Sequence, residues 1–359
     1  MKLLKILLIL LALGLLVAGG LTFWMSRALN RSIAHTKGEE YIKIEKGTAP
    51  RDVIAQLASQ GIIVSETPVF LYFRLFGDPS KLQAGDYQFK SPISALEVLK
   101  ELEKGETLTT RLTIPEGFTR FDIAKRIAER FPQEPPADDK AILALMDDTS
   151  LIRDIAPEAR NLEGYMYPST YAFPKQTDAK VIIKALVDQF KRSWKPEWTG
   201  AARARSMSVH EVVTKASLIE TETPVETERP IVAGVINNRL SMGIPLGIDQ
   251  TNVYIAKMLG RWDGTIHKSD LEVDSPYNTR IKSGLPPGPI SSVTASSINA
   301  ALNPDANNYI FYVLNVDAND GSHWFYASAA EFEKGKAKYQ QWLEKERQLK
   351  REAEANTNN

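Results

Sequence analysis

The first strong feature of the chain is an uninterrupted apolar run close to its start. Residues 6–25 carry no charged side chain, and two lysines precede them. Twenty residues at a helical rise of about 1.5 Å span roughly 30 Å, the thickness of the hydrocarbon core of a bilayer. The alternative is a signal peptide cleaved near Val17-Ala18-Gly19. The run is long for a signal peptide, and Trp24 near its end is a typical interfacial residue, so we favour an uncleaved anchor. Because the N-terminus before the run is short, we expect residues 1–5 to lie in the cytoplasm.

After a polar linker at residues 26–38, the pattern changes to short strands and amphipathic helices. Residues 41–58 and 111–128 match each other at an offset of 70 positions. Each copy has a short alternating strand, a glycine turn and an amphipathic helix. The matched positions are Ile44 with Ile114, Gly47 with Gly117, Asp52 with Asp122, Val53 with Ile123, Leu57 with Ile127 and Ala58 with Ala128. Two copies alone are also compatible with ordinary packing of strands and helices.

The pattern as a whole predicts an α+β protein with an N-terminal transmembrane helix. A strand at 86–89 and a helix at 94–103 would complete a small α+β subdomain over residues 39–108. A mixed α+β domain is expected over residues 109–345, with a late hairpin and a final charged helix. Residues 346–359 are expected to form a charged, disordered tail.

One helix in the second domain carries a carboxylate on its apolar side. Ser208 and Glu211 have the spacing of a capping box, and the apolar stripe that follows continues to Glu220. A carboxylate on a buried stripe costs free energy unless it is protonated or paired, and burial raises its pKa. Such a group suits general acid catalysis. The alternative is that Glu220 forms a structural ion pair with Arg229 or Arg239, and the pattern leaves both open.

Three more glutamates follow Glu220 closely. Glu226 and Glu228 precede Pro230 at the start of the next helix, where acids complement the helix dipole. Glu222 has no such explanation and is a possible helper of Glu220. Asp249 opens a polar segment, up to residue 252, that we expect to be a loop presenting hydrogen bonds.

Other segments have the residue types of a carbohydrate site. Residues 275–279 and 284–290 are rigid, turn-rich loops, and the first contains Tyr277 and Asn278. Residues 161–173 combine several aromatic side chains with Glu163. These aromatics suit stacking on a sugar and packing of a core equally well.

Composition excludes several classes of function. The 359 residues balance 44 basic against 44 acidic side chains, which argues against nucleic-acid binding. The absence of cysteine excludes disulfides, thiolate nucleophiles and cysteine-ligated metals. The four histidines are scattered without metal-ligand spacing, so we expect neither a metal nor a cofactor.

Taken together, these motifs resemble the YceG-like family of endolytic murein transglycosylases. The resemblance rests on linked motifs in order along the chain, including LEGYxxP at 162–168, SxxExET at 217–223, NNRL at 237–240, SPYNT at 275–279 and GLPPGPI at 284–290. It implies that residues 39–108 are a LysM-like glycan-binding subdomain and that Glu220 is the catalytic acid and base. Departures are Gln250, where many members have proline, and Pro224, which closely follows the glutamate motif.

The resemblance also implies a reaction. Glu220 would protonate the glycosidic oxygen between N-acetylmuramic acid and N-acetylglucosamine and then deprotonate the muramyl C6 hydroxyl, giving a 1,6-anhydro end without water. Substrate contacts are expected from Glu222, Asp249, Thr251, Tyr277, Asn278 and Glu163. Alternatives are a hydrolytic muramidase that uses Glu222 or Asp249 as its second acid, and a glycan-binding scaffold without activity.

The expected setting follows from the same resemblance. The protein would be a single-pass protein of the bacterial cytoplasmic membrane, with its catalytic domain on the outer side. It would trim nascent peptidoglycan strands and so limit their elongation, beside the peptidoglycan synthases. No nucleic acid and no cofactor is expected to take part.

Overall fold

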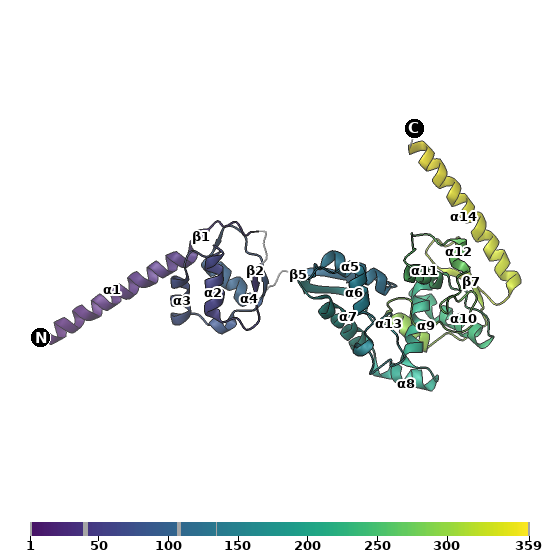
Figure 1. The fold of residues 1–359 in the computed structure, drawn as a ribbon, viewed down its shortest axis with the longest axis horizontal. Helices are drawn as coiled ribbons and strands as arrows, with labels where there is room; N and C mark the ends of the chain where they lie inside the picture. Colours follow the sequence, from purple (N-terminus) through teal and green to yellow (C-terminus); the bar gives the residue numbers. More distant parts are fainter. Residues whose placement is uncertain (1, 39–41, 106–108, 134, 358–359) are drawn as a thin grey trace. The chain divides into compact units, whose positions relative to one another are not determined.

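The computed structural model describes residues 2–38, 42–105, 109–133 and 135–357, and the chain divides into two compact units (Figure 1). The small unit comprises the chain up to Thr110 together with Ala172–Lys175, and the large unit comprises Arg111–Tyr171 and Gln176–Asn359. The ends of the expected LysM-like segment, residues 39–41 and 106–108, lie outside the described residues, as do the last two residues of the expected tail.

A single long helix, α1 (Lys2–Asn30), opens the small unit. Its segment Leu7–Asn30 is long and apolar enough to cross a membrane. The helix continues through the start of the expected linker, because Met25 and Leu29 are buried in the core of the unit. Strand β1 (Ser32–Ile33) then pairs with β4 (Ile93–Ser94) in antiparallel fashion. The expected linker at 26–38 therefore contains structure that joins α1 to the unit.

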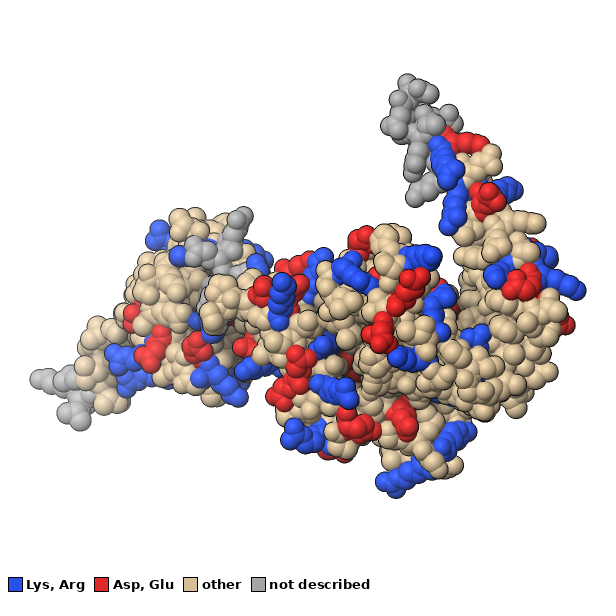
Figure 2. Space-filling model, turned by 45° about the vertical axis from the view of Figure 1, so that its right-hand side comes forward, with Lys and Arg blue, Asp and Glu red and all other residues tan. Residues whose placement is uncertain are grey.

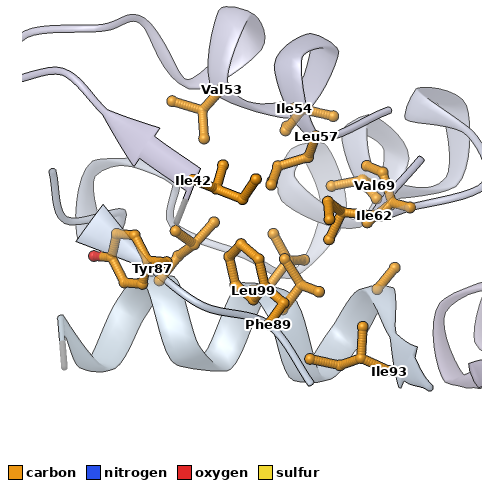
Figure 3. Close-up of a cluster of buried hydrophobic side chains, with 14 of the residues drawn as sticks. Ile42, Val53, Ile54, Leu57, Ile62, Val69, Tyr87, Phe89, Ile93 and Leu99 are labelled. Atoms are coloured by element: carbon orange, nitrogen blue, oxygen red, sulfur yellow. The ribbon is translucent and has the colours of Figure 1, made fainter. Parts of the chain in front are cut away.

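The remaining elements of the small unit surround one hydrophobic core, part of which is drawn in Figure 3. Ile42 and Tyr87 face each other across the antiparallel pair β2–β3, and both side chains point into this core with Leu57 and Leu99 from two helices. The elements are β2 (Ile42–Ile44), α2 (Pro50–Ser59), α3 (Glu66–Leu75), η1 (Pro79–Lys81), β3 (Gly85–Tyr87) and α4 (Ala95–Lys104).

The large unit is mainly helical, with two small sheets. Strand β5 (Thr109–Ile114) pairs with β6 (Ser169–Pro174), and Arg111–Ile114 and Ser169–Tyr171 are the parts of these strands that belong to the large unit. Strand β7 (Phe311–Leu314) pairs with β8 (His323–Tyr326) as the expected hairpin. The helices are α5 (Arg120–Arg130), α6 (Asp139–Leu145), η2 (Thr149–Leu151), α7 (Ala179–Ser193), α8 (Pro196–Ala204), α9 (Val209–Glu222), η3 (Glu226–Glu228), α10 (Arg229–Ser241), α11 (Asp249–Met258), α12 (Lys268–Leu271), α13 (Ala295–Leu302) and α14 (Ala329–Thr357).

Helix α9 is the central element of the large unit. It packs against α8, α10, α11 and α13. Every residue from Val212 to Glu220 is buried, so the helix has no solvated side over these positions. Polar side chains of a helix surrounded in this way have to find partners inside the protein, and the Thr214 hydroxyl is buried without one. Lys215 is satisfied, because it donates to Asn237 Oδ1 on α10 and to the Ala301 carbonyl on α13.

The sequence repeat corresponds to a repeated local structure. In both copies a strand leads through a glycine to a helix, β2 to α2 in the first and β5 to α5 in the second. Gly47 has φ of 88° and Gly117 has φ of 71°, values in the left-handed region that favour glycine. The matched glycines therefore make the same turn in each copy.

Two segments differ from the sequence-based expectation. Residues 249–252 form the first turn of helix α11, not a loop, and Asp249 is the acid of that turn, where the helix dipole favours it. Residues 346–357, expected to be disordered, continue helix α14. The composition of this segment, rich in Glu, Lys, Arg and Ala, favours a helix without help from packing.

Charges of both signs are interspersed over the face of the molecule shown in Figure 2. This arrangement agrees with the zero formal net charge of the chain.

The burial of α1 in the small unit gives a first prediction. Leu29→Ala should lower the free energy of unfolding of this unit by about 2–5 kcal/mol, because it removes a buried leucine from a packed core. The matched control is Leu21→Ala, earlier in the same helix, where the leucine side chain is 43% exposed. Denaturant unfolding of the full chain in nanodiscs measures both, and equal effects would contradict the described packing.

Candidate active site

The catalytic candidate Glu220 is positioned by a helix that begins with the expected capping box. Ser208 Oγ accepts a hydrogen bond from the Glu211 N–H at 3.1 Å, and Glu211 Oε2 accepts one from the Ser208 N–H at 2.8 Å. The capping box is thus confirmed. Helix α9 continues to Glu222, so both Glu220 and Glu222 lie in its last turn.

Glu220 is enclosed and fully engaged by hydrogen-bond donors. Its Oε1 accepts from Arg229 Nη2 at 2.9 Å. Its Oε2 accepts from the Thr294 N–H at 2.8 Å and from the Thr294 hydroxyl at 2.7 Å. The side chain is 1% exposed and that of Arg229 is 3% exposed. Of the two readings left open by the sequence, the structure contains the ion pair, with Arg229 and not Arg239 as partner.

Arg229 is shared among several carboxylates. Its Nη2 also lies 3.6 Å from Glu116 Oε2, and its Nη1 lies 4.0 Å from Glu226 Oε1. The side chains of Glu116 and Glu226 are 63% and 74% exposed, so they reach the buried guanidinium from the solvent side. Arg229 Nη1 donates to the Thr294 hydroxyl at 2.9 Å, while its Nε is buried without a hydrogen-bond partner. Arg229 therefore connects a buried carboxylate to two that water can reach.

A turn and a loop bring Glu116 to this cluster. The Gly117 N–H donates to the Ser292 carbonyl at 3.3 Å, and the Ser292 N–H donates to the Phe118 carbonyl at 2.7 Å. These bonds align the turn after β5 with the segment just before Thr294. Because Thr294 is the N-cap of α13, one loop supplies both the cap of that helix and the donors to Glu220.

Glu222 faces a different environment. Residues two apart on a helix project in nearly opposite directions, and Glu222 accepts a hydrogen bond from the Tyr312 hydroxyl of strand β7. Burial raises the pKa of Glu222 to about 7, and the charge of Asp249 adds to this rise, while the Tyr312 hydroxyl and the charge of Arg239 oppose it. Glu222 therefore has a carboxyl whose pKa lies near neutral pH.

The remaining expected substrate contacts divide into exposed and buried side chains. Asp249 is half exposed and accepts from Arg280 Nε at 2.8 Å. Thr251 and Asn278 are fully buried and bind backbone carbonyls. Thr251 Oγ1 donates to Ile248 O at 2.6 Å, and Asn278 Nδ2 donates to two carbonyls of the preceding segment at 3.0 and 2.9 Å. Thr251 therefore binds the backbone at the start of α11, the helix that carries Asp249, and Asn278 binds the backbone of residues 271 and 273.

Tyr277 and Glu163 belong to a second cluster around Tyr254. The rings of Tyr277 and Tyr254 lie 5.1 Å apart. Both oxygens of Glu163 accept from the Arg120 N–H, at 3.1 and 3.0 Å, and the residue is 1% exposed. Burial raises the pKa of Glu163 to about 7, against the opposing effects of Arg120 and the Tyr254 hydroxyl. Glu163 is thus held inside the protein, while Tyr277 is partly exposed.

The aromatic segment that contains Glu163 is used at least in part for packing. Tyr165 is fully buried, its hydroxyl lies 2.8 Å from His210 Nδ1, and its ring meets Phe190 edge to face at 5.2 Å. For Tyr165, the structure therefore selects the core-packing reading over the sugar-stacking one.

Two residues of the Glu220 cluster were absent from the sequence-based candidates. Thr294 has the signature of an N-cap, but nothing local connects it to a glutamate 74 positions earlier. Glu116 stands directly before the turn glycine of the second repeat copy, where the first copy has Lys46. This change from a lysine to a glutamate at matched positions was the sequence feature that could have indicated Glu116. Among the described residues, no group of three or more His, Asp and Glu side chains could hold a metal ion.

Comparisons with known proteins agree with this organisation. The YceG-like family model matches residues 42–338. The endolytic murein transglycosylase of Bacillus subtilis is 31% identical over 340 residues, which cover 90% of this chain and 91% of that protein. The protein of the same name from Streptococcus pneumoniae strain D39 is 28% identical over 312 residues, which cover 79% of this chain and 55% of that protein.

A solved structure matches as well. The crystal structure of a YceG-like protein from Listeria monocytogenes is 30% identical and superposes with a TM-score of 0.55, covering 83% of this chain and 99% of that one. With the family match over most of its length and a curated relative above 30% identity, this chain belongs to the YceG-like family.

Proposed function

We propose that this protein is an endolytic murein transglycosylase that cleaves peptidoglycan strands between N-acetylmuramic acid and N-acetylglucosamine. The family membership and the name of the Bacillus subtilis relative support this activity. The observation that carries it to specific residues is the Glu220 cluster. A carboxyl at the end of a buried helix is held by Arg229 and Thr294 beside a carboxylate, Glu116, that water can reach.

In the proposed reaction, Glu220 gives a proton to the glycosidic oxygen, and the bond from that oxygen to muramyl C1 breaks. The C6 hydroxyl oxygen then forms a bond to C1, and its proton passes to Glu220. The carboxyl returns to its starting state, the product carries a 1,6-anhydro ring, and no water is consumed. One carboxyl that acts first as acid and then as base is sufficient for this sequence.

The contacts of Arg229 suggest how a paired carboxylate takes up a proton. An isolated buried ion pair is difficult to open, because the remaining charge loses its partner. Arg229, however, already lies within 4.0 Å of Glu116 and Glu226. In our proposal these carboxylates keep Arg229 paired when Glu220 is protonated. The charge of Glu116 is also available to stabilise the oxocarbenium-like transition state.

The hydrolytic alternative has one specific observation in its favour. Glu220 and Glu116 contact the same nitrogen, Arg229 Nη2, so their carboxyl groups are close enough to act as a pair. Retaining glycosidases have two carboxyl groups about 5–5.5 Å apart. If Glu116 acted as nucleophile, water would end the reaction and the product would have a reducing end. Glu222, which faces Tyr312, lacks these contacts with the Glu220 cluster.

For substrate binding, we propose that Asp249 and Tyr277 touch the glycan directly, because both side chains are partly exposed. Thr251, Asn278 and Glu163 would act through the backbone segments that they bind. The same proposal assigns Glu222 to the positioning of hairpin β7–β8 against the end of α9.

We also propose a cellular setting. Helix α1 would anchor the protein in the bacterial cytoplasmic membrane, with both units on the outer side, as its apolar segment allows. An enzyme held there reaches glycan close to the membrane, which is newly made. The protein would therefore limit the elongation of nascent strands beside the peptidoglycan synthases.

Glu220→Gln tests the catalytic assignment. The variant keeps the shape of the side chain but has no carboxyl that can donate and accept a proton. Release of anhydro ends should therefore fall about 10²–10⁴-fold. The matched control is Glu129→Gln, an exposed glutamate on α5, which should retain wild-type activity. Product release from uncrosslinked glycan strands is followed by mass spectrometry, with circular dichroism as the check of folding. Wild-type release by Glu220→Gln would refute the assignment.

Glu116→Gln separates the two reactions. In the transglycosylase the variant should still give anhydro products, with a rate loss of at most about fivefold, because an exposed charge contributes no more than ~1 kcal/mol. In the hydrolase it would remove the nucleophile and abolish cleavage. Product masses distinguish the anhydro form from the reducing form, which is heavier by one water. Loss of all activity together with reducing ends from the wild type would favour the hydrolase.

Glu222→Gln tests the shifted pKa. Because the pKa is raised to about 7 from 4.5, the folded protein keeps a proton that the unfolded chain has lost between these values. The contribution of this proton to stability is fully present below the pKa that Glu222 has in the unfolded chain, and it is lost as the pH rises through about 7. The variant should therefore lose about 1–3 kcal/mol less stability than the wild type on going from about pH 5 to about pH 8. Urea unfolding measures this difference, and identical pH dependence would contradict the raised pKa of Glu222. Glu163, whose pKa is also raised to about 7, is present in both proteins and therefore adds the same pH dependence to each.

A further inference from the structure

Helix α1 enters the small unit directly, and this fixes where a bilayer would end. From residue 6 to Trp24 the helix rises about 28 Å, close to the thickness of a hydrocarbon core. The next turn contains Met25, which is 5% exposed and packed in the core of the unit. Trp24 itself is 47% exposed. A membrane crossed by α1 must therefore reach its surface within about one turn of the body of the small unit.

The part of the small unit that meets α1 at this point is helix α3 with the turn before it. The two helices are in contact, and Figure 1 shows α3 at the edge of the unit next to the exposed part of α1. A hollow between them is lined by side chains of both, including Trp24, Ala28, Val64 and Pro68, and by Arg31. Val64 is 67% exposed in this position.

Helix α3 exposes apolar side chains at its C-terminal end beside polar ones, while Phe70, Leu71 and Tyr72 in its middle pack against the core. Its ten residues, ETPVFLYFRL, include Glu66, Thr67 and Arg74 as the polar side chains. Val69 and Phe73 face the core, but Leu75 and the adjacent Phe76 are 50% and 64% exposed. A surface helix normally has an apolar stripe that faces the core and charged side chains on the opposite face. Exposed apolar side chains thus lie at both ends of α3, counting Val64 before its start.

Helix α4 of the same unit provides the comparison. Its sequence, ALEVLKELEK, buries Ala95, Val98, Leu99 and Leu102 and carries its glutamates and lysines on the other side. A helix of this unit can thus have a polar outer side, so the exposed apolar side chains at the ends of α3 are particular to that helix. Both helices contact α1, but in Figure 1 α3 lies at the edge of the unit beside the exposed apolar part of α1.

We propose that α3, with Val64 and Phe76 at its ends, lies in the lipid interface of the membrane that α1 crosses. The proposal rests on the anchoring role proposed for α1 and goes beyond it, because an anchor alone requires no second contact with lipid. Amphipathic helices at membrane surfaces bury their apolar side about 5–10 Å into the boundary between headgroups and acyl chains. Arg31, beside the hollow, would meet the headgroups. The small unit would then stand on the bilayer in a fixed orientation.

The absence of cysteine from the chain allows a direct test with single labels. Val64→Cys and Phe76→Cys, each in the full chain, are labelled with an environment-sensitive fluorophore. The labelled proteins are reconstituted into vesicles of phosphatidylcholine and phosphatidylglycerol that contain lipids with a spin label at an acyl chain. Lys46→Cys, exposed at the glycine turn of the same unit, is the negative control, and Leu15→Cys, in the middle of the apolar segment, is the positive control.

The proposal predicts a blue shift and strong quenching at positions 64 and 76, between the values at positions 15 and 46. Solvent-like emission at both positions, equal to that at position 46, would overturn it. Shielding without quenching by the labelled lipids would also overturn it, and would identify a second copy of the chain as the occupant if it decreased on dilution with lipid. Unquenched emission at position 15 would refute the anchor and the proposal together. Release of anhydro ends by the same samples reports separately on the proposed enzymatic function.

Discussion

The large unit depends on the pairing of one buried carboxylate. Glu220 is removed from water, and an unpaired charge in that position would cost several kcal/mol. Three donors compensate this cost, one from Arg229 at the start of α10 and two from Thr294 at the start of α13. The ends of three helices must therefore meet within hydrogen-bond distance. The requirement of charge pairing thus positions the same residues that would carry out the chemistry.

The neighbouring contacts extend this constraint outward. Ser217, one turn before Glu220, accepts from the Ile290 N–H, and the segment that follows aligns with the turn that carries Glu116. Deeper in the unit, Lys215 joins α9 to α10 and α13 a second time, and burial lowers its pKa to about 8. The helix is therefore fixed by polar contacts at two levels. Arg229 contacts both the buried carboxylate of Glu220 and the exposed carboxylates of Glu116 and Glu226.

The sequence was informative where the determinants are local. The capping box of Ser208 and Glu211, the hairpin near the C-terminus and the repeated glycine turns follow from spacings of a few residues, and each is present. Glu220 lies where the helix period predicts burial, but its hydrogen bonds to Thr294 depend on packing between distant segments. The raised pKa of Glu222 could not be predicted for the same reason, because the desolvation that raises it, and the Tyr312 hydroxyl that opposes it, depend on how distant parts of the chain pack together. The expected linker was misjudged because Leu29 packs on residues that follow it by dozens of positions.

We propose that a single carboxyl, Glu220, cleaves glycan without water. The most direct measurement is the mass of the products that the wild-type protein releases from glycan strands in water enriched in oxygen-18. The account predicts anhydro ends that contain no heavy oxygen, and loss of these products in Glu220→Gln. Reducing ends that carry oxygen-18 would contradict it and would identify the protein as a hydrolase.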